Sequence, residues 1–271
     1  MLKLNNIKIS NGNKLVLIAG PCVIESEKAI ITIAKRLKDI TEELEIDLIF
    51  KSSFKKANRT SLNSFTGPGI DRGMEILNTV KQKFDLPILT DIHESHEAEK
   101  IAMVADIIQI PAFLCRQTDL LLAAGETKKI INIKKGQFLA PEKMTHAIEK
   151  VKSTGNNKIM LTERGTTFGY NNLVVDMRAL EIMKKLNVPV VMDATHSVQM
   201  PGGVGSTTEG NPEFIEPLAK AAVAIGVAAL FLEVHPNPPK ALSDAGSQLK
   251  LSDLKKLMNK LLQIDRIIKN Y

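Results

Sequence analysis

The chain contains no tryptophan and only two tyrosines and two cysteines among its 271 residues. Because single-stranded nucleic acids stack their bases on aromatic side chains, this scarcity argues against nucleic-acid binding. Two cysteines allow one disulfide at most, so we expect Cys22 and Cys115 to be free thiols, as in a reducing compartment. No apolar run approaches the roughly 20 residues that span a bilayer, and the N-terminus lacks the apolar stretch of a signal peptide. We therefore expect a cytoplasmic protein without a membrane partner.

A long block of one charge is also missing. The net charge is +6, from 36 Lys and Arg against 30 Asp and Glu, and the excess is spread along the chain. Lysines such as Lys255, Lys256 and Lys260 lie at helical spacing, which is typical of a solvated face. The charge therefore favours no nucleic-acid partner, and a basic site for small anionic substrates explains it better.

Short apolar runs alternate with helical patterns along the whole chain. The runs are rich in Ile, Val and Leu and mostly continuous, as in parallel strands that are buried on both faces. They cover residues 15–20, 47–53, 86–92, 105–112, 129–134, 158–164, 188–194 and 228–234. This alternation predicts an α/β fold in which residues 1–271 form a single (β/α)8 TIM barrel domain. A doubly wound open sheet is the structural alternative.

The helical patterns lie between these runs, each with an apolar stripe. They cover residues 26–44, 70–84, 95–105, 117–128, 141–153, 174–186, 212–226 and 251–269. Ser26 is the expected N-cap of the first, and Pro141 and Pro212 stand where a first helical turn tolerates proline. Ahead of the first run, Asn11-Gly12 separates two short alternating stretches. This predicts an N-terminal β-hairpin over residues 1–14 that plugs the N-terminal mouth of the barrel.

Four candidate metal ligands lie at or just past the ends of predicted strands: Cys22, His196, Glu233 and Asp244. The loops after the strands of a closed barrel open on one face, so these side chains are expected to converge. Mixed sulfur, nitrogen and oxygen ligands fit a catalytic divalent ion, and iron, zinc, manganese and cobalt are all admissible. The plainer interpretations are an apolar core residue for Cys22, a metal-free acid or base for His196, an ion-pair partner for Glu233 and a helix cap for Asp244.

Cationic residues follow several of the same strands. Arginine grips phosphate or carboxylate with a planar fork, and lysine acts as a point charge. A lone Lys or Arg is more often a solvated group or an ion-pair partner, but clustering at strand ends suits a pair of anionic substrates. The set is Lys56, Arg59, Arg116, Lys134 and Arg164.

Three further features are less specific. His93, after Asp91, either orients a substrate or satisfies a buried carboxylate, and Cys115 is expected to be a packed thiol. The glycines at 202, 203 and 205 do not form a dinucleotide-binding fingerprint, and they suggest a mobile loop that closes over substrate.

Eight motifs together carry a family resemblance: GPCVIES, KSSFKKANRTS, TDIHES, DIIQIPAFLCRQTDLL, KKGQFLAP, LTERGTTFGYNNLVVDMR, DATHSVQMPGG and PKALSDAGSQL. From about residue 15 to the C-terminus, the chain resembles the 3-deoxy-D-manno-octulosonate 8-phosphate synthase family. The resemblance implies a (β/α)8 barrel, usually a homotetramer. It also implies condensation of phosphoenolpyruvate with arabinose 5-phosphate and water, with release of phosphate, for the lipopolysaccharide inner core.

This family has a metal-requiring class with Cys in the GPC motif and a metal-free class with Asn there. Cys22 and the KALSDAGSQ stretch are similar to the metal class, whereas the N-terminal hairpin is a feature of the metal-free class. The resemblance therefore implies a divalent ion on Cys22, His196, Glu233 and Asp244. Lys56, His196 and Asp244 are the expected catalytic residues.

The resemblance also assigns substrate contacts. Phosphoenolpyruvate is expected on Lys56, Arg116, Lys134 and Arg164, and the sugar phosphate on Asn58, Arg59 and Thr60, where Thr60 replaces a common Ser but keeps the hydroxyl. Further expected substrate-binding residues are Lys51, Asp91, His93 and Gln109.

Two alternatives remain at this stage. A 3-deoxy-D-arabino-heptulosonate 7-phosphate synthase would use erythrose 4-phosphate, but we expect a KPRTS-like segment there in place of the KANRTS at residues 56–61. A non-catalytic barrel that binds a sugar phosphate as a regulator would need the cations but not the metal set.

Overall fold

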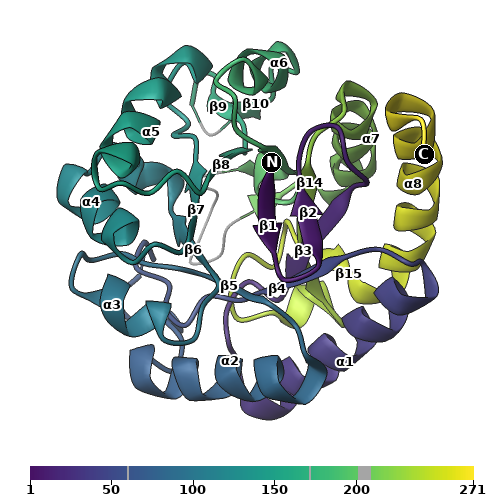
Figure 1. The fold of residues 1–271 in the computed structure, drawn as a ribbon. Helices are drawn as coiled ribbons and strands as arrows, with labels where there is room; N and C mark the ends of the chain where they lie inside the picture. Colours follow the sequence, from purple (N-terminus) through teal and green to yellow (C-terminus); the bar gives the residue numbers. More distant parts are fainter. Residues whose placement is uncertain (60, 171, 201–208) are drawn as a thin grey trace.

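The computed structural model describes residues 1–59, 61–170, 172–200 and 209–271. Parallel strands form a closed barrel that is surrounded by helices (Figure 1). The strands pair in chain order, and the last pairs with the first: β3 (Val16–Gly20), β4 (Leu48–Lys51), β5 (Ile88–Asp91), β6 (Ile107–Ile110), β7 (Ile130–Lys134), β8 (Ile159–Glu163), β11 (Val190–Asp193) and β14 (Ala229–His235). The predicted (β/α)8 barrel is confirmed, and the open-sheet alternative is wrong because β14 closes onto β3.

Helices follow the strands as the sequence patterns predict. They are α1 (Glu27–Glu43), α2 (Ile70–Phe84), α3 (Glu97–Ala102), α4 (Thr118–Glu126), α5 (Met144–Ser153), α6 (Arg178–Lys184), α7 (Ile215–Ile225) and α8 (Leu254–Lys269). Ser26 caps α1, with its hydroxyl oxygen accepting from Ala29 N. Pro141 and Pro212 begin the 3₁₀ turns η2 (Pro141–Lys143) and η4 (Pro212–Phe214), which lead into α5 and α7.

Short elements decorate the loops. They are the strands β9 (Thr166–Thr167), β10 (Leu173–Val174), β12 (Gln199–Met200), β13 (Glu209–Gly210) and β15 (Leu249–Lys250), and the 3₁₀ turns η1 (Ala112–Leu114), η3 (His196–Val198), η5 (Pro238–Lys240) and η6 (Leu251–Asp253). The sixth helix, predicted from residue 174, begins at Arg178, because Val174 pairs with Thr166 of β9 instead of joining the helix.

The N-terminal hairpin exists, but its predicted turn is wrong. Strands β1 (Leu2–Leu4) and β2 (Ile7–Ile9) turn at Asn5-Asn6, where Asn5 has a left-handed φ of 51°. Asn11 instead binds the start of β11, donating to Val188 O at 3.1 Å and accepting from Val190 N at 2.9 Å.

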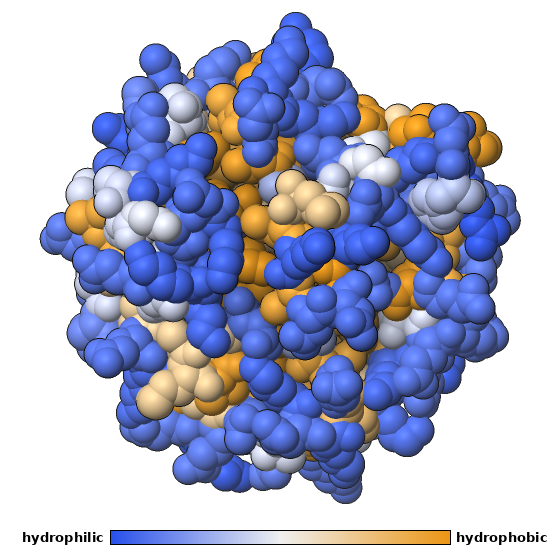
Figure 2. Space-filling view, in the orientation of Figure 1, coloured by the Kyte–Doolittle hydropathy of each residue, from blue (hydrophilic) through white to orange (hydrophobic). Residues whose placement is uncertain are grey.

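Two apolar layers position the site. Residues of the outer strand faces pack under the helices, and the inner faces form a second cluster that includes Ile18, Met160 and Phe231. Leu2, Ile7 and Ile9 of the hairpin join this inner cluster, so the hairpin plugs the N-terminal mouth as predicted (Figure 1). In the same view, hydrophobic residues are visible in the middle of this face and hydrophilic ones cover most of its rim (Figure 2). With this end filled, the opposite C-terminal end of the barrel is the end available for a site.

Across the described ranges, no helix has both the length and the apolar character needed to cross a membrane.

Candidate metal and anion site

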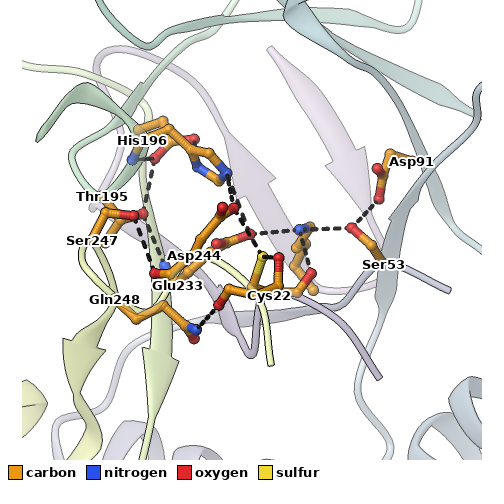
Figure 3. Close-up of polar contacts among 12 residues, drawn as sticks. Cys22, Ser53, Asp91, Thr195, His196, Glu233, Asp244, Ser247 and Gln248 are labelled. Carbon is orange, nitrogen blue, oxygen red and sulfur yellow. Dashed lines mark hydrogen bonds and ion pairs between the residues drawn. The ribbon is translucent and has the colours of Figure 1, made fainter. Parts of the chain in front are cut away.

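Cys22, Glu233 and Asp244 meet at the C-terminal end of the barrel (Figure 3). One ligand atom from each lies within 4.8 Å of the other two, and Cys22 Sγ is 3.1 Å from Asp244 Oδ2. Cys22 follows β3, whose last residue Gly20 approaches β4 so closely that a Cβ there would lie 1.8 Å from Lys51 O. Asp244 adopts a left-handed φ of 47°, a conformation that aspartate tolerates better than most residues.

His196, the fourth predicted ligand, lies beside this group of three. Its Nε2 lies 3.5 Å from Glu233 Oε1 and 4.0 Å from Asp244 Oδ2. Its Nδ1 lies 2.6 Å from Asp193 Oδ2, and Asp193 also accepts the His196 backbone N–H at 2.8 Å. A carboxylate on one ring nitrogen is the usual way in which proteins orient a metal-binding histidine. Asp193 therefore holds Nδ1, and the ring turns its Nε2 toward Glu233 and Asp244.

The donor set fits a divalent ion. Glu233 Oε2 is buried without a hydrogen-bond partner among the described residues, which is costly for a carboxylate oxygen. Burial, Asp244 and Glu233 raise the pKa of the Cys22 thiol well above its usual value. A cation among these groups would satisfy the orphaned oxygen and replace the thiol proton.

Neighbouring positive charges hold Glu233 ionised. Burial opposes the charge, but His196, Lys51 and Lys56 together keep the pKa of Glu233 well below its usual value. Glu233 Oε1 lies 2.9 Å from Lys51 Nζ and 3.9 Å from Lys56 Nζ. Lys51 Nζ also donates to Ser53 Oγ at 3.1 Å and to Cys22 O at 3.4 Å, so each of its N–H bonds has a protein acceptor. Its predicted substrate contact stays a prediction.

Lys134 and Arg164 supply positive charge on the other side of His196. Lys134 Nζ pairs with Asp193 Oδ2 at 2.6 Å; burial lowers the lysine pKa, and the Asp193 charge offsets part of that effect. Arg164 donates to His196 O at 2.7 Å and to Gln199 Oε1 at 2.6 Å. Its buried Nε has no acceptor among the residues that the structure describes. A donor left free in this way suits an anionic ligand.

The remaining predicted residues lie at different distances from this cluster. Asp91 and His93 are linked to it through Ser53, as described below. Gln109 is buried in the barrel and accepts from Asn132 at 3.2 Å. Asn58 and Arg59 lie in the segment after β4, where Arg59 donates to Phe65 O at 3.0 Å and to Leu242 O at 2.5 Å.

Among the described residues, the Arg116 side chain makes no hydrogen bond or ion pair with this cluster. It is exposed between η1 and α4, and its carbonyl accepts from Lys150 Nζ at 3.0 Å. Its predicted phosphoenolpyruvate contact stays a prediction. Thr60 and the glycines at 202, 203 and 205 lie outside the described residues.

Cys115 is a buried free thiol as predicted, and Cys22 is buried as well. Neither forms a disulfide, since both are described residues and both are free.

Sequence reasoning missed several residues that orient the site. Asp193 orients His196, and its place at the end of an apolar strand, three residues before a histidine, was the available signal. Lys135 is fully buried and donates to Gly136 O and Thr166 Oγ1, while Glu163 Oε1 accepts from Arg164 N at 2.9 Å. These contacts hold the loop that carries Arg164.

The model of the DAHP synthetase I family matches residues 1–270. The chain belongs to this family. It is 53% identical over 268 residues to the 2-dehydro-3-deoxyphosphooctonate aldolase of Syntrophotalea carbinolica, across 99% of this chain and 97% of the relative. The enzyme of the same name from Fusobacterium nucleatum is 53% identical over 268 residues, across 99% and 96% of the two chains. That from Rickettsia felis is 54% identical over 269 residues, across 99% and 98%.

This aldolase name and 3-deoxy-D-manno-octulosonate 8-phosphate synthase denote the same enzyme family, so the resemblance predicted from the motifs is confirmed. The family model carries the name of the heptulosonate alternative, but these relatives carry the octulosonate name over nearly their whole lengths.

Proposed function

We propose that the chain condenses phosphoenolpyruvate with D-arabinose 5-phosphate and water to give 3-deoxy-D-manno-octulosonate 8-phosphate and phosphate. This is a transferase reaction, and its product would serve the lipopolysaccharide inner core. The observation that supports it best is the meeting of a mixed-donor ligand set with buried cations at the open end of one barrel. As the resemblance implies, we propose that it acts in the cytoplasm as a homotetramer.

The cations suit phosphoenolpyruvate, which carries a phosphate and a carboxylate. Arg164 has an N–H without an acceptor among the described residues. Arg164 and Lys134 both contact His196, Arg164 at its carbonyl oxygen and Lys134 at Nδ1. Lys56 is mostly buried and lies 3.9 Å from Glu233. Arg164 and Lys134 would hold phosphoenolpyruvate, with help from Arg116. Asn58 and Arg59, with Thr60, would hold the phosphate end of the sugar. Fixing two anions against their mutual repulsion supplies much of the barrier reduction.

The carbon–carbon bond forms between C3 of phosphoenolpyruvate and the aldehyde carbon of the sugar. Burial opposes the charge on Lys56, but Cys22, Glu233 and Asp91 raise its pKa well above the usual value. Lys56 therefore stays an ammonium and would donate a hydrogen bond to the aldehyde oxygen as negative charge develops there. Water then adds at C2, and phosphate leaves.

Cys22, His196, Glu233 and Asp244 would hold a divalent ion, with iron, zinc, manganese and cobalt as candidates. Such an ion supplies Lewis-acid polarisation when bound. Asp193 keeps the His196 ring directed at the site, and Lys51 keeps Glu233 ionised.

The test is an assay of phosphate release from phosphoenolpyruvate with either arabinose 5-phosphate or erythrose 4-phosphate, before and after chelation. We expect release with arabinose 5-phosphate, loss of it after chelation and recovery with added divalent ion. Release with erythrose 4-phosphate alone would identify a heptulosonate synthase instead. Binding of sugar phosphate without any turnover would indicate a regulatory barrel.

A further inference from the structure

Glu97 is a buried carboxylate on the first turn of α3 that has no role in the site described so far. Its Oε2 accepts two backbone N–H bonds from the segment before the helix, from His93 at 2.7 Å and from Glu94 at 3.1 Å. The same oxygen lies 3.7 Å from His93 Nδ1. Burial opposes ionisation, but His93 and the two backbone N–H bonds lower the pKa of Glu97 to about 2. Glu97 is therefore a fixed negative charge facing the His93 ring.

His93 lies between two carboxylates. Its Nε2 is 3.2 Å from Asp91 Oδ2 on one side, and its Nδ1 faces Glu97 on the other. The ring of Phe54 packs against it edge-on, with the centroids 5.8 Å apart. Burial favours the neutral ring, but Asp91 and Glu97 raise the pKa of His93 to about 9. The ring is therefore an imidazolium at neutral pH, with Nε2 paired to Asp91, while Nδ1 faces Glu97 beyond hydrogen-bond distance and has no hydrogen-bond partner among the described residues.

Asp91 connects this ring to the candidate metal ligands. Its Oδ1 accepts from Ser53 Oγ at 2.5 Å, a contact drawn in Figure 3. Ser53 Oγ in turn accepts from Lys51 Nζ at 3.1 Å, and Lys51 pairs with Glu233. The buried charges thus alternate in sign from Glu97 through His93, Asp91 and Lys51 to Glu233. Each interior charge in this series has a neighbour of opposite charge on both sides, so Glu97 is the group that terminates it.

We propose that Glu97 is a positioning residue for the condensation. Glu97 holds the His93 ring protonated, with Nε2 paired to Asp91. In this way it keeps the Asp91 carboxylate directed at Ser53, and Ser53 in turn binds Lys51 beside the site. The inference rests on the proposed function for its kinetic test only. Glu97 acts through His93 and does not itself reach the cluster around Cys22.

The charged groups around His93 fix the direction of the expected pH effect. They are Asp91 from β5 and Glu97 from α3, while Lys51 and Lys56, in and after β4, act on Asp91. Because the pKa of His93 is raised in the folded protein, the imidazolium is present below about pH 9 and is lost above it. Removal of the Glu97 charge lowers that pKa, so activity that needs the imidazolium should end at a lower pH.

The first measurement is the titration of His93 by NMR in full-length protein. There are five histidines, and a His93→Gln variant assigns the signal. In Glu97→Gln, the amide oxygen still accepts the two backbone bonds but the charge is gone. We expect the His93 pKa to fall by about one unit or more, as for loss of an opposite charge within a few ångströms. Glu99→Gln is the matched control, because Glu99 is exposed on the same helix, and it should leave the His93 titration unchanged.

The second measurement is the pH profile of kcat/KM for phosphoenolpyruvate. In Glu97→Gln the alkaline limb should move to lower pH by the same amount as the His93 titration, and in Glu97→Asp, whose shorter side chain withdraws the charge, it should move in the same direction by a smaller amount. An unchanged His93 titration in Glu97→Gln overturns the proposal. So does an altered titration with a wild-type pH profile, because Glu97 would then be a structural residue only.

If Glu97→Gln does not fold, the NMR titration of His93 in Glu97→Asp tests the proposal instead. We expect an intermediate His93 pKa there because the shorter side chain withdraws the charge, and a wild-type titration would overturn the proposal. Wild-type protein that releases no phosphate would refute the proposed function instead, and the same NMR titration would still decide whether Glu97 controls His93.

Discussion

The buried pair of Lys51 and Glu233 makes a quantitative prediction about stability. The two side chains are 2% and 1% exposed, and their charged atoms are 2.9 Å apart. Lys51→Met keeps most of the side-chain volume and removes the charge. Glu233 then remains buried with weaker partners, Lys56 Nζ at 3.9 Å and His196 Nε2 at 3.5 Å from the same oxygen.

Removing one partner from a buried ion pair costs about 3–5 kcal/mol, because the other charge stays buried. The two remaining partners of Glu233 should keep the loss at the lower end, about 3 kcal/mol in the free energy of unfolding. That is a change of more than about 100-fold in the unfolding equilibrium. The measurement is equilibrium urea unfolding of chelator-treated protein.

Lys35→Met is the matched control. Lys35 pairs with Asp39 at 3.0 Å, but the side chains are 67% and 45% exposed. Such a pair contributes about 0.5 kcal/mol or less. Added divalent ion should stabilise Lys51→Met more than wild type, because an ion on Glu233 supplies the missing positive charge. A Lys51→Met protein as stable as the Lys35→Met control, without metal, would show that Glu233 does not depend on Lys51.

Three further predictions concern the proposed reaction. A strong chelator should abolish phosphate release and added divalent ion should restore it, with Cys22→Ala behaving like the chelated enzyme; full activity in metal-stripped protein would refute the metal assignment while leaving the reaction intact. Cys22→Asn should lose metal affinity, since an amide is a poor ligand for a softer ion. It should keep a measurable rate of phosphate release that is well below wild type and that the chelator does not affect. A folded Cys22→Asn variant that binds phosphoenolpyruvate but is wholly inactive would contradict this. Arg59→Ala should raise the KM for arabinose 5-phosphate far more than that for phosphoenolpyruvate, because an arginine fork makes charge-assisted bonds to phosphate. If steady-state kinetics show an equal rise in both KM values, Arg59 does not bind the sugar phosphate specifically.

Local sequence was enough to predict the barrel. The continuous apolar runs at 15–20 and 228–234 became the paired strands β3 and β14, because strands buried on both faces need apolar side chains on both. Ser26 was a correct N-cap prediction because capping is also local: it depends on one side chain and the backbone N–H three residues later.

Local signals failed where another segment competed for the same residues. Asn11-Gly12 has the composition of a hairpin turn, yet Asn11 lies 177 residues from the Val188 carbonyl that it binds, and Asn5 makes the turn. Val174, at the predicted start of the sixth helix, pairs instead with Thr166 of β9. For Asn11 the competing segment is remote in sequence, whereas for Val174 it is a nearby strand of the same loop.

The site divides in the same way. The residue types and their places at strand ends were readable from the sequence, which is why Cys22, His196, Glu233 and Asp244 could be named as candidate ligands. Only the closed barrel decided that atoms of Cys22, Glu233 and Asp244 lie within 4.8 Å. Arg116, by contrast, is exposed between η1 and α4.

The roles of the supporting charged residues could not be predicted from the sequence. Glu97 is one of several acidic residues in a helical pattern, and the charge of Glu99 nearby is exposed. Glu97 is buried because α3 turns its first residues toward the end of β5, where His93 lies. The strength of an interaction between charges depends on their distance and burial, and both are set by how the elements pack. The sequence by itself therefore determined which groups stand at the strand ends, and the tertiary structure decided which of them interact.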